Sequence, residues 1–241
     1  MRYAVISDVH SNLEALEEVL RAVEQERVDR LLCAGDMVGY GADPAACLEL
    51  LRDKAHQAVR GNHDEAAIGQ MDLDWFDRLA RGAVQWTQGQ LSEGHRRYLQ
   101  SLPLIWKDQE VTLAHGSLHQ PEQFHYLFDP AKAQASFSVQ PTPVAFIGHT
   151  HIPVVFVQKG SSILFHRSTQ IQVEPPAKVL VNVGSVGQPR DGDPRACYAV
   201  YDTASGTIDI RRVAYPFQKT QAKIRAAGLP ELLAERLALG Y

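Results

Sequence analysis

Seven side chains of the metal-binding type are spread over the first two thirds of this 241-residue chain. They are two carboxylates, one amide and four imidazoles: Asp8, His10, Asp36, Asn62, His115, His149 and His151. Seven donors suit two divalent ions if one carboxylate bridges them. Two ions about 3.5–4 Å apart can activate a hydroxide and hold both oxygens of an in-line phosphoryl displacement. Mixed nitrogen and oxygen donors without thiolate favour Mn, Fe, Zn, Co or Ni over Ca or Mg.

The donors follow short apolar runs that predict buried strands. The first three runs span residues 3–6, 31–34 and about 56–59. Asp8, Asp36 and Asn62 come within three residues of the ends of these runs. Because helical patterns separate the runs, we expect parallel strands whose carboxyl ends share one edge of a sheet, where ligands bind in such folds. A glycine that permits a sharp exit from the strand precedes three of the donors: Gly35, Gly61 and Gly148.

The remaining pattern predicts an α/β protein. Helical spacing covers residues 13–23, 45–51, 74–100 and 218–239, with a weak helix at 131–135. Further strands are expected at residues 104–106, 111–114, 144–147, 154–157, 163–165, 179–183, 197–201 and 207–213. Two mixed β-sheets packed face to face, with helices outside, would bury all of these strands. We therefore expect a four-layer α/β/β/α sandwich as a single domain over residues 1–241, with a C-terminal helical tail at about 218–241.

The composition excludes several classes of protein. The net charge of −4 and the absence of a basic stripe argue against a nuclease or a stable nucleic-acid binder. No apolar run approaches the roughly 20 residues of a spanning helix, and an acid and a histidine within the first ten residues argue against a signal peptide. The three cysteines form no CxxC pair and are expected to be buried thiols in a reducing compartment. We expect a cytoplasmic protein without membrane contact.

Five short motifs resemble, in order, those of the calcineurin-like metallophosphoesterases. They are Asp8-Val9-His10, Gly35-Asp36, Gly61-Asn62-His63-Asp64, His115-Gly116 and Gly148-His149-Thr150-His151. Each motif alone is more typical of a turn with solvated side chains, but five of them in this order at strand ends are a specific signal. The resemblance covers residues 5 to about 200.

The resemblance implies a role for each residue. One ion would be held by Asp8, His10, Asp36 and His151. The other would be held by Asp36, Asn62, His115 and His149, so that Asp36 bridges the two. His63 would not bind metal but would be the catalytic residue that donates to the phosphoryl oxygen or the leaving group. Asn62 would also contact substrate, and a hydroxide bridging the two ions would attack phosphorus.

The chain departs from the family's protein phosphatases at one motif. Those enzymes carry Asp-Arg-Gly where this chain has Gly39-Tyr40-Gly41. The arginine that grips the phosphate and the aspartate that orients the catalytic histidine are therefore missing, and adjacent Asp64 is a doubtful substitute. We expect Arg190, in the glycine-rich segment 184–190, to bind substrate phosphate instead. The alternative is a surface arginine paired with Asp191 or Asp193.

These observations predict a dinuclear-metal-dependent phosphoesterase. In residues 35–41 and 184–190 the chain looks closest to bacterial phosphoesterases described as dinucleoside-tetraphosphate hydrolases, small phosphodiesterases or relatives of Ser/Thr phosphatases. We expect hydrolysis of a phosphodiester or phosphoanhydride bond in a small phosphorylated substrate, with a dinucleoside polyphosphate as the specific nucleotide candidate. The alternatives are a phosphomonoesterase or Ser/Thr protein phosphatase and, further away, a non-catalytic protein-binding scaffold of the same fold. Such scaffolds lose the histidine that is His63 here.

Overall fold

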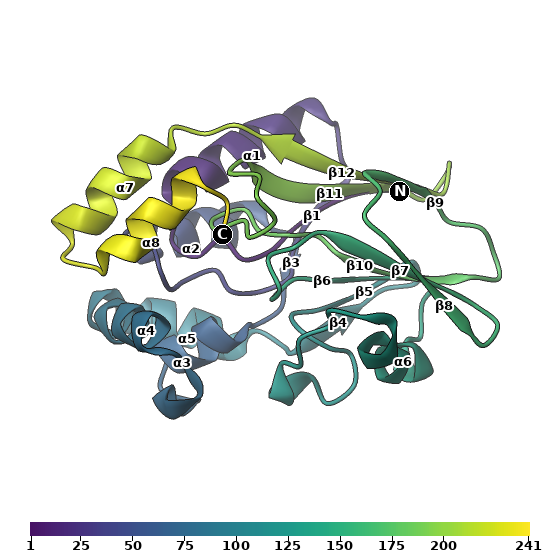
Figure 1. Cartoon of the computed structure of the whole chain (residues 1–241), viewed down its shortest axis with the longest axis horizontal. Coiled ribbons are helices and arrows are strands. Elements are labelled where there is room, and N and C mark those ends of the chain that lie inside the picture. Colours follow the sequence, from purple (N-terminus) through teal and green to yellow (C-terminus); the bar gives the residue numbers. More distant parts are fainter.

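Two six-stranded mixed sheets face each other at the centre of the molecule (Figure 1). The computed structural model describes all 241 residues. In spatial order, the first sheet contains β3 (Gln57–Ala58), β2 (Arg30–Cys33), β1 (Arg2–Ile6), β11 (Ala196–Asp202), β12 (Thr207–Val213) and β9 (Gln170–Gln172). The second contains β4 (Ile105–Lys107), β5 (Val111–Ala114), β6 (Val144–Ile147), β10 (Lys178–Asn182), β7 (Val154–Lys159) and β8 (Ser162–His166). With helices on both outer faces, this architecture confirms the predicted α/β/β/α sandwich.

Alternating side chains along β1 hold the layers together. Tyr3 and Val5 point into the apolar layer between the sheets, whereas Ala4 and Ile6 pack toward the helices on the outer face. The outer helices are α1 (Leu13–Gln25) and α2 (Pro44–Lys54) on the first sheet and α6 (Pro130–Val139) on the second. β1 runs parallel to β2, and β2 to β3, so their carboxyl ends meet at one edge, as predicted.

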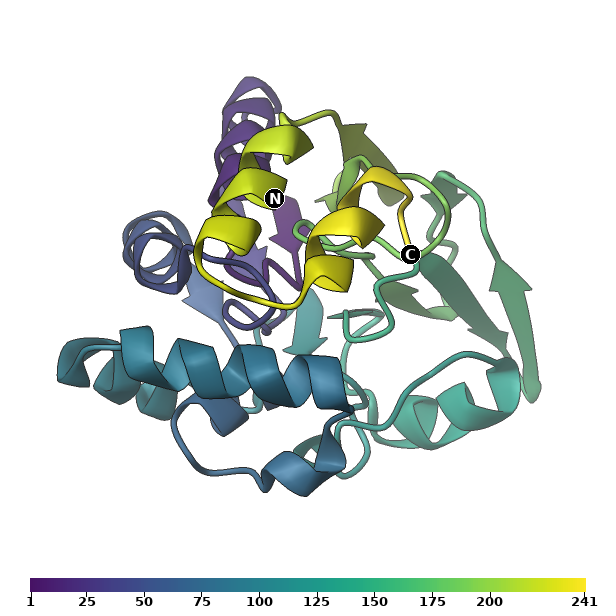
Figure 2. The same ribbon diagram turned by 60° about the vertical axis from the view of Figure 1, so that its left-hand side comes forward.

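The remaining helices, apart from the 3-10 helix η2 (Pro121–Gln123) in the segment after β5, gather at the end of the sandwich where β1 to β3 finish (Figures 1 and 2). They are α3 (Asn62–Ala67), α4 (Arg78–Gln90), α5 (Glu93–Ser101), α7 (Phe217–Ala226), α8 (Glu231–Glu235) and the 3-10 helices η1 (Leu73–Trp75) and η3 (Arg236–Ala238). In Figure 2, α7 and α8 lie above α4. Side chains from both groups share one buried apolar cluster, which includes Val84, Ile224, Leu233 and Leu237. The C-terminal helices are therefore packed into the core at this end.

Several elements differ from the prediction. The sequence pattern predicts neither β9 nor α3, which begins inside the motif Gly61-Asn62-His63-Asp64. The helical region predicted at 74–100 is divided into η1, α4 and α5, and α6 is about twice as long as the expected weak helix. No helix is long and apolar enough to cross a membrane. The three cysteines are buried and unpaired, as expected.

Candidate metal centre

Segments at the ends of five strands carry the seven predicted donors; six of them come together, and the seventh, Asn62, begins α3 next to His63. The segments after β1, β2, β3, β5 and β6 carry, in this order, Asp8 and His10, Asp36, Asn62, His115, and His149 and His151. The two carboxylates and four imidazoles are each at most 5% exposed. Each motif alone could have been a turn with solvated side chains. The burial of six ionisable side chains at one edge of the sandwich excludes that interpretation.

The first group of donors consists of Asp8, His10 and His151. Asp8 Oδ1 lies 3.2 Å from His151 Nε2 and 3.7 Å from His10 Nε2. The two imidazole nitrogens are 3.1 Å apart. One ligand atom of each residue lies within 4.8 Å of the others, so the three could hold one ion.

The second group consists of Asp36, His115 and His149. Asp36 Oδ2 lies 3.2 Å from His115 Nε2, which in turn lies 3.1 Å from His149 Nδ1. The same carboxylate oxygen is 3.6 Å from His10 Nε2 of the first group. Asp36 therefore lies between the two groups, where a bridging ligand would have to be.

Main-chain carbonyls fix the orientation of three of the imidazoles. A carbonyl oxygen lies within 3.0 Å of Nδ1 in His10, His115 and His151. Because a carbonyl can only accept, each Nδ1 carries a proton, so that in the neutral imidazole Nε2 presents a lone pair to the cluster. The lone pairs of His10 and His151, on nitrogens 3.1 Å apart, repel each other unless a cation lies between them.

Unpartnered buried oxygens also fit a cation. Asp8 Oδ1 and Asn62 Oδ1 are buried and have no hydrogen-bond donor. A buried acceptor left unpaired destabilises the fold by about 1–3 kcal/mol. A divalent ion would give both oxygens a partner, and the carboxylate, amide and imidazole donors match the preferences of transition metals.

Three charge states of the cluster favour cation binding, and one opposes it. The neighbouring Asp36 carboxylate outweighs burial and raises the pKa of His115 to about 9, so this imidazole must release a proton when a metal binds. Burial alone would raise the pKa of Asp8, but the neighbouring imidazoles of His151 and His10 together outweigh it and hold the pKa of Asp8 well below its usual range. Burial, together with His115, lowers the pKa of His149 to about 3. Burial, together with Arg190, lowers the pKa of His151 to about 4. An ionised carboxylate and neutral imidazoles are the forms that bind metal.

Backbone strain is concentrated at the same residues. Ten non-glycine residues have positive φ, and five of them are predicted site residues: Asp8, His10, Asp36, His149 and His151. Such conformations cost about 1–3 kcal/mol each and persist where the surrounding structure imposes them, most often at functional sites. The fold thus imposes this geometry on the cluster against local preference.

His63 lies at the edge of the cluster with no carboxylate to orient it. Its Nδ1 is buried without a hydrogen-bond partner, and a Cβ on Gly39 would lie only 2.5 Å from that nitrogen. The short distance to His63 leaves no room for a side chain at position 39, and Gly39 has a φ of +94°, so both features require glycine there. The rings of Tyr40 and Phe76, with centroids 4.5 Å and 4.9 Å away, hold the imidazole instead. Burial lowers the pKa of His63 well below its usual value.

Asp64 has a different role from the missing aspartate. Its Oδ1 accepts hydrogen bonds from Met37 N (2.9 Å) and Val38 N (3.2 Å), and its Oδ2 accepts one from Gly61 N (3.0 Å). Burial and the neighbouring Asp36 carboxylate raise the pKa of Asp64 to about 7. Asp64 therefore ties the loop after β2 to the start of α3, and the doubt about it as a partner of His63 is justified.

Arg190 lies beside the residue that replaces the family's phosphate-gripping arginine. Its guanidinium carbon is 5.5 Å from the centroid of the Tyr40 ring. The alternative, an arginine paired with Asp191 or Asp193, is wrong, because those carboxylates pair with other arginines. The guanidinium is thus left available beside the cluster.

A cavity of about 470 Å³ opens next to the cluster. We call it the aromatic cleft; its lining includes Tyr40, Asn62, His63, Trp75, Phe76 and Tyr126. Trp75 is 75% exposed, and Tyr126 stacks on His149 with ring centroids 3.8 Å apart. The sequence prediction misses Trp75 and Tyr126, because neither belongs to a motif and only the fold brings their segments to the same cavity.

Comparison with known proteins gives consistent matches. Residues 1–206 match the family model of the calcineurin-like phosphoesterase superfamily domain. The uncharacterized protein MJ0912 of Methanocaldococcus jannaschii is 41% identical over 241 residues, which cover 98% of this chain and 97% of that protein. Phosphodiesterase YfcE of Escherichia coli K12 is 30% identical over 212 residues, 84% of this chain and 88% of its own.

A solved structure extends this similarity to the whole chain. The crystal structure of a metallophosphoesterase from Sphaerobacter thermophilus superimposes with a TM-score of 0.88 at 42% sequence identity. The match covers 100% of this chain and 99% of that one. The similarity therefore includes the C-terminal helices, which lie beyond residue 206.

Proposed function

Because the chain belongs to the calcineurin-like phosphoesterase superfamily and is a metal-dependent phosphoester hydrolase, we propose that it cleaves a phosphodiester or phosphoanhydride bond in a small molecule. The observation that carries this proposal is the aromatic cleft, which opens directly beside the buried cluster of donors. Its volume of about 470 Å³ is in the range of small-molecule sites. Aromatic walls suit a planar group such as a nucleobase, which favours a dinucleoside polyphosphate as substrate.

We propose that the cluster holds two divalent ions, of Mn, Fe, Zn, Co or Ni. Asp8, His10, Asp36 and His151 would hold one ion, and Asp36, Asn62, His115 and His149 the other. When bound, the ions supply an activated hydroxide and neutralise charge that develops on the phosphoryl group. The short nitrogen–nitrogen separations and the unpartnered buried oxygens support this assignment.

Side chains of the protein would position the substrate and handle the proton. Asn62 and His63 line the cleft next to the cluster. Since Nδ1 of His63 is buried against Gly39, Nε2 is the nitrogen that can donate to a phosphoryl oxygen or the leaving group. The Arg190 guanidinium would bind a phosphate oxygen.

We further propose that all 241 residues form one domain, supported by the apolar cluster that the C-terminal helices share with α4. Three buried, unpaired cysteines support a cytoplasmic location.

An activity panel tests the proposed function. The chain, stripped with a chelator and reloaded with each of the five metals, is assayed on nitrophenyl mono- and diesters, dinucleoside polyphosphates and a phosphopeptide. We expect metal-dependent turnover with the highest kcat/KM on a diester or a dinucleoside polyphosphate. The highest kcat/KM on the phosphopeptide would indicate a protein phosphatase, and on the monoester a phosphomonoesterase. Absence of turnover with every metal would favour the scaffold.

A further inference from the structure

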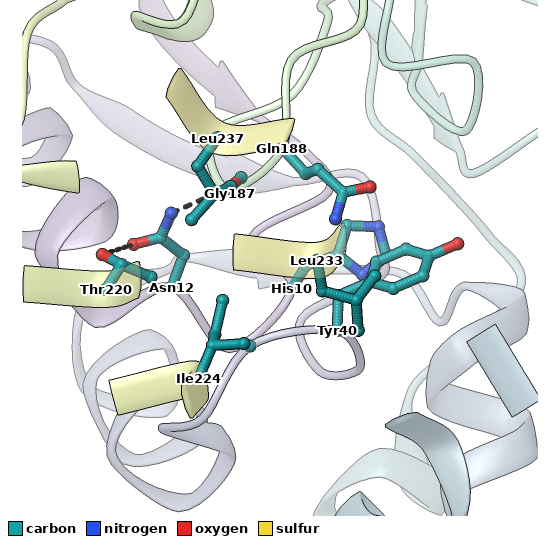
Figure 3. Close-up of a pocket in the computed structure, with 10 residues that line it drawn as sticks. His10, Asn12, Tyr40, Gly187, Gln188, Thr220, Ile224, Leu233 and Leu237 are labelled. Atoms are coloured by element: carbon teal, nitrogen blue, oxygen red, sulfur yellow. Dashed lines mark hydrogen bonds between the residues drawn. The ribbon is translucent and has the colours of Figure 1, made fainter. Parts of the chain in front are cut away.

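Two arginines from distant parts of the chain meet at one glutamine. Arg190 Nη2 donates to Gln188 Oε1 at 2.8 Å, and Arg236 Nη1 donates to the same oxygen at 3.2 Å. Arg236 begins η3, beyond the residues that match the family model. Figure 3 shows the Gln188 side chain reaching over the rings of His10 and Tyr40. The glutamine thus holds two guanidinium groups together on the side of the metal cluster.

No carboxylate pairs directly with either arginine of this pair. Neither Arg190 nor Arg236 forms an ion pair, whereas the neighbouring Arg195 and Arg212 both bind carboxylates. The Nε atoms of Arg190 and Arg236 are buried without an acceptor. Burial and the adjacent Arg190 lower the pKa of Arg236, as expected for two close positive charges that share only a neutral oxygen. Two partly buried cations without a carboxylate partner favour the binding of an anion.

The pair is directly connected to the predicted metal ligands. The main-chain oxygen of Gln188 lies 2.6 Å from His151 Nδ1, and Arg190 N donates to His151 O at 3.2 Å. The Arg190 guanidinium also lies over the Tyr40 ring, which lines the aromatic cleft. An anion held by both arginines would therefore lie next to a phosphoryl group at the cluster.

We infer that Arg190 and Arg236 together bind a second phosphate of the substrate, adjacent to the phosphate that is cleaved. Two guanidinium groups offer paired donors to phosphate oxygens, and Gln188 keeps them in place when the site is empty of substrate. This inference rests on the proposed function and narrows it. The substrate class is a phosphoanhydride with at least two consecutive phosphates, either a nucleoside polyphosphate or an inorganic polyphosphate.

Calorimetric titration of the Mn²⁺-loaded protein tests the inference at fixed free Mn²⁺. The two probes are α,β-methylene-ADP and the phosphonate analogue of AMP, which differ by one phosphate. We expect Arg236→Gln and Arg190→Gln to weaken binding of the diphosphate probe about tenfold more than binding of the monophosphate probe, since each removes a charge-assisted hydrogen bond. Equal losses for the two probes, or no loss, would overturn the inference.

The matched control is Lys219→Gln, which removes an exposed positive charge from α7 in the same C-terminal segment. We expect this variant to distinguish the probes as the parent does. If it gives the same selective loss as Arg236→Gln, the effect is one of net charge and the inference is wrong. Thermal unfolding checks that each variant folds. If Arg236→Gln does not fold, Arg236→Lys keeps the charge but loses the planar fork, and a selective loss is expected there too.

Kinetics separates this inference from the proposed function. Turnover of bis(nitrophenyl) phosphate by the parent protein tests the function alone. With diadenosine tetraphosphate and inorganic tripolyphosphate, Arg236→Gln should raise KM about tenfold more than it does with the nitrophenyl diester, and kcat should change less than KM. The KM values of the parent protein for diadenosine tetraphosphate and tripolyphosphate are then compared. The substrate with the lower KM indicates whether the second phosphate belongs to a nucleotide or to an inorganic polyphosphate. Suppose that the parent hydrolyses the diester, but that Arg236→Gln does not change the ratio of the KM for either polyphosphate to the KM for the diester. This result would contradict the role of the arginine pair without contradicting the proposed function.

Discussion

Asp36 contacts both groups of donors and the start of α3. Its Oδ2 lies 3.2 Å from His115 Nε2 and 3.6 Å from His10 Nε2, so it faces both groups of donors. Its Oδ1 accepts a hydrogen bond of 2.9 Å from the main-chain nitrogen of His63 at the start of α3. One carboxylate therefore orients the segment that carries His63 as well as facing both proposed ions.

We expect the Asp36→Asn variant to lose more than one equivalent of bound metal per chain relative to the parent protein. The substitution removes the negative charge shared by both groups, so both sites weaken. Elemental analysis after dialysis against a metal buffer measures the content. Asp53→Asn, at an exposed position on α2, is the control and should retain the parental content. Full occupancy by two metals in Asp36→Asn would show that the bridging assignment is wrong.

The His63→Gln variant should separate metal binding from catalysis. We expect it to keep two metals and the folded state while kcat falls by about 10²–10⁴-fold, the usual contribution of a well-placed proton donor. The loss should be smaller for nitrophenyl esters, whose leaving groups need less protonation. His166→Gln, exposed on β8, is the control.

Two outcomes would change the role of His63. A uniform loss across leaving groups would indicate that it stabilises charge instead of donating a proton. Loss of metal would make it a ligand, which its position within 4.8 Å of His10 and Asp36 ligand atoms allows.

At the scale of elements, local sequence signals explain both what is predicted and what is missed. Runs such as residues 3–6 are apolar throughout because both faces of β1 are covered, so the strand and its end can be recognised locally. β9 has only Ile171 between two exposed glutamines and exists because it pairs with β12, more than 30 residues away. α3 starts at a donor motif, and its capping depends on Asp64 reaching back to Gly61.

The link between the loop after β2 and α3 depends on Asp64. Asp64→Ala removes three hydrogen bonds from buried main-chain nitrogens, so we expect the free energy of unfolding to fall by about 2–5 kcal/mol. Metal content should also fall, because Asp36 and Asn62 lie on the two joined segments. Urea unfolding and elemental analysis measure the two effects. Asp74→Ala, at an exposed position in η1, should change neither, and an unchanged Asp64→Ala would show that other contacts hold the segments.

At the scale of the whole molecule, the C-terminal helices are the part whose role is least visible in the sequence. Helical spacing predicts that they exist, but their position depends on contacts with residues far away in the chain. Ile224, Leu233 and Leu237 pack with α4, and Arg236 reaches Gln188, 48 residues earlier. No local pattern encodes such pairings, so Arg236 cannot be assigned before the fold is known.

Adjacent leucines in α8 allow a direct test of this packing. Leu233 is fully buried, whereas Leu232 is 39% exposed. Leu233→Ala should reduce the free energy of unfolding by about 2–5 kcal/mol through the cavity that it leaves. Leu232→Ala should change it by no more than about 0.5 kcal/mol. Denaturant titration of the two variants measures the difference; similar small effects would mean that the C-terminal helices pack only loosely on the rest of the molecule.

The exposed indole of Trp75 gives the molecule an optical reporter. The chain has three tryptophans, and only Trp75 is largely solvent-exposed, at the wall of the aromatic cleft. Trp86 and Trp106 are partly buried in apolar clusters. A water-exposed indole emits at longer wavelength than a buried one and is accessible to a quencher such as acrylamide. A nucleobase stacked in the cleft should therefore reduce this long-wavelength emission and its quenching, so that occupancy can be followed by fluorescence without any label.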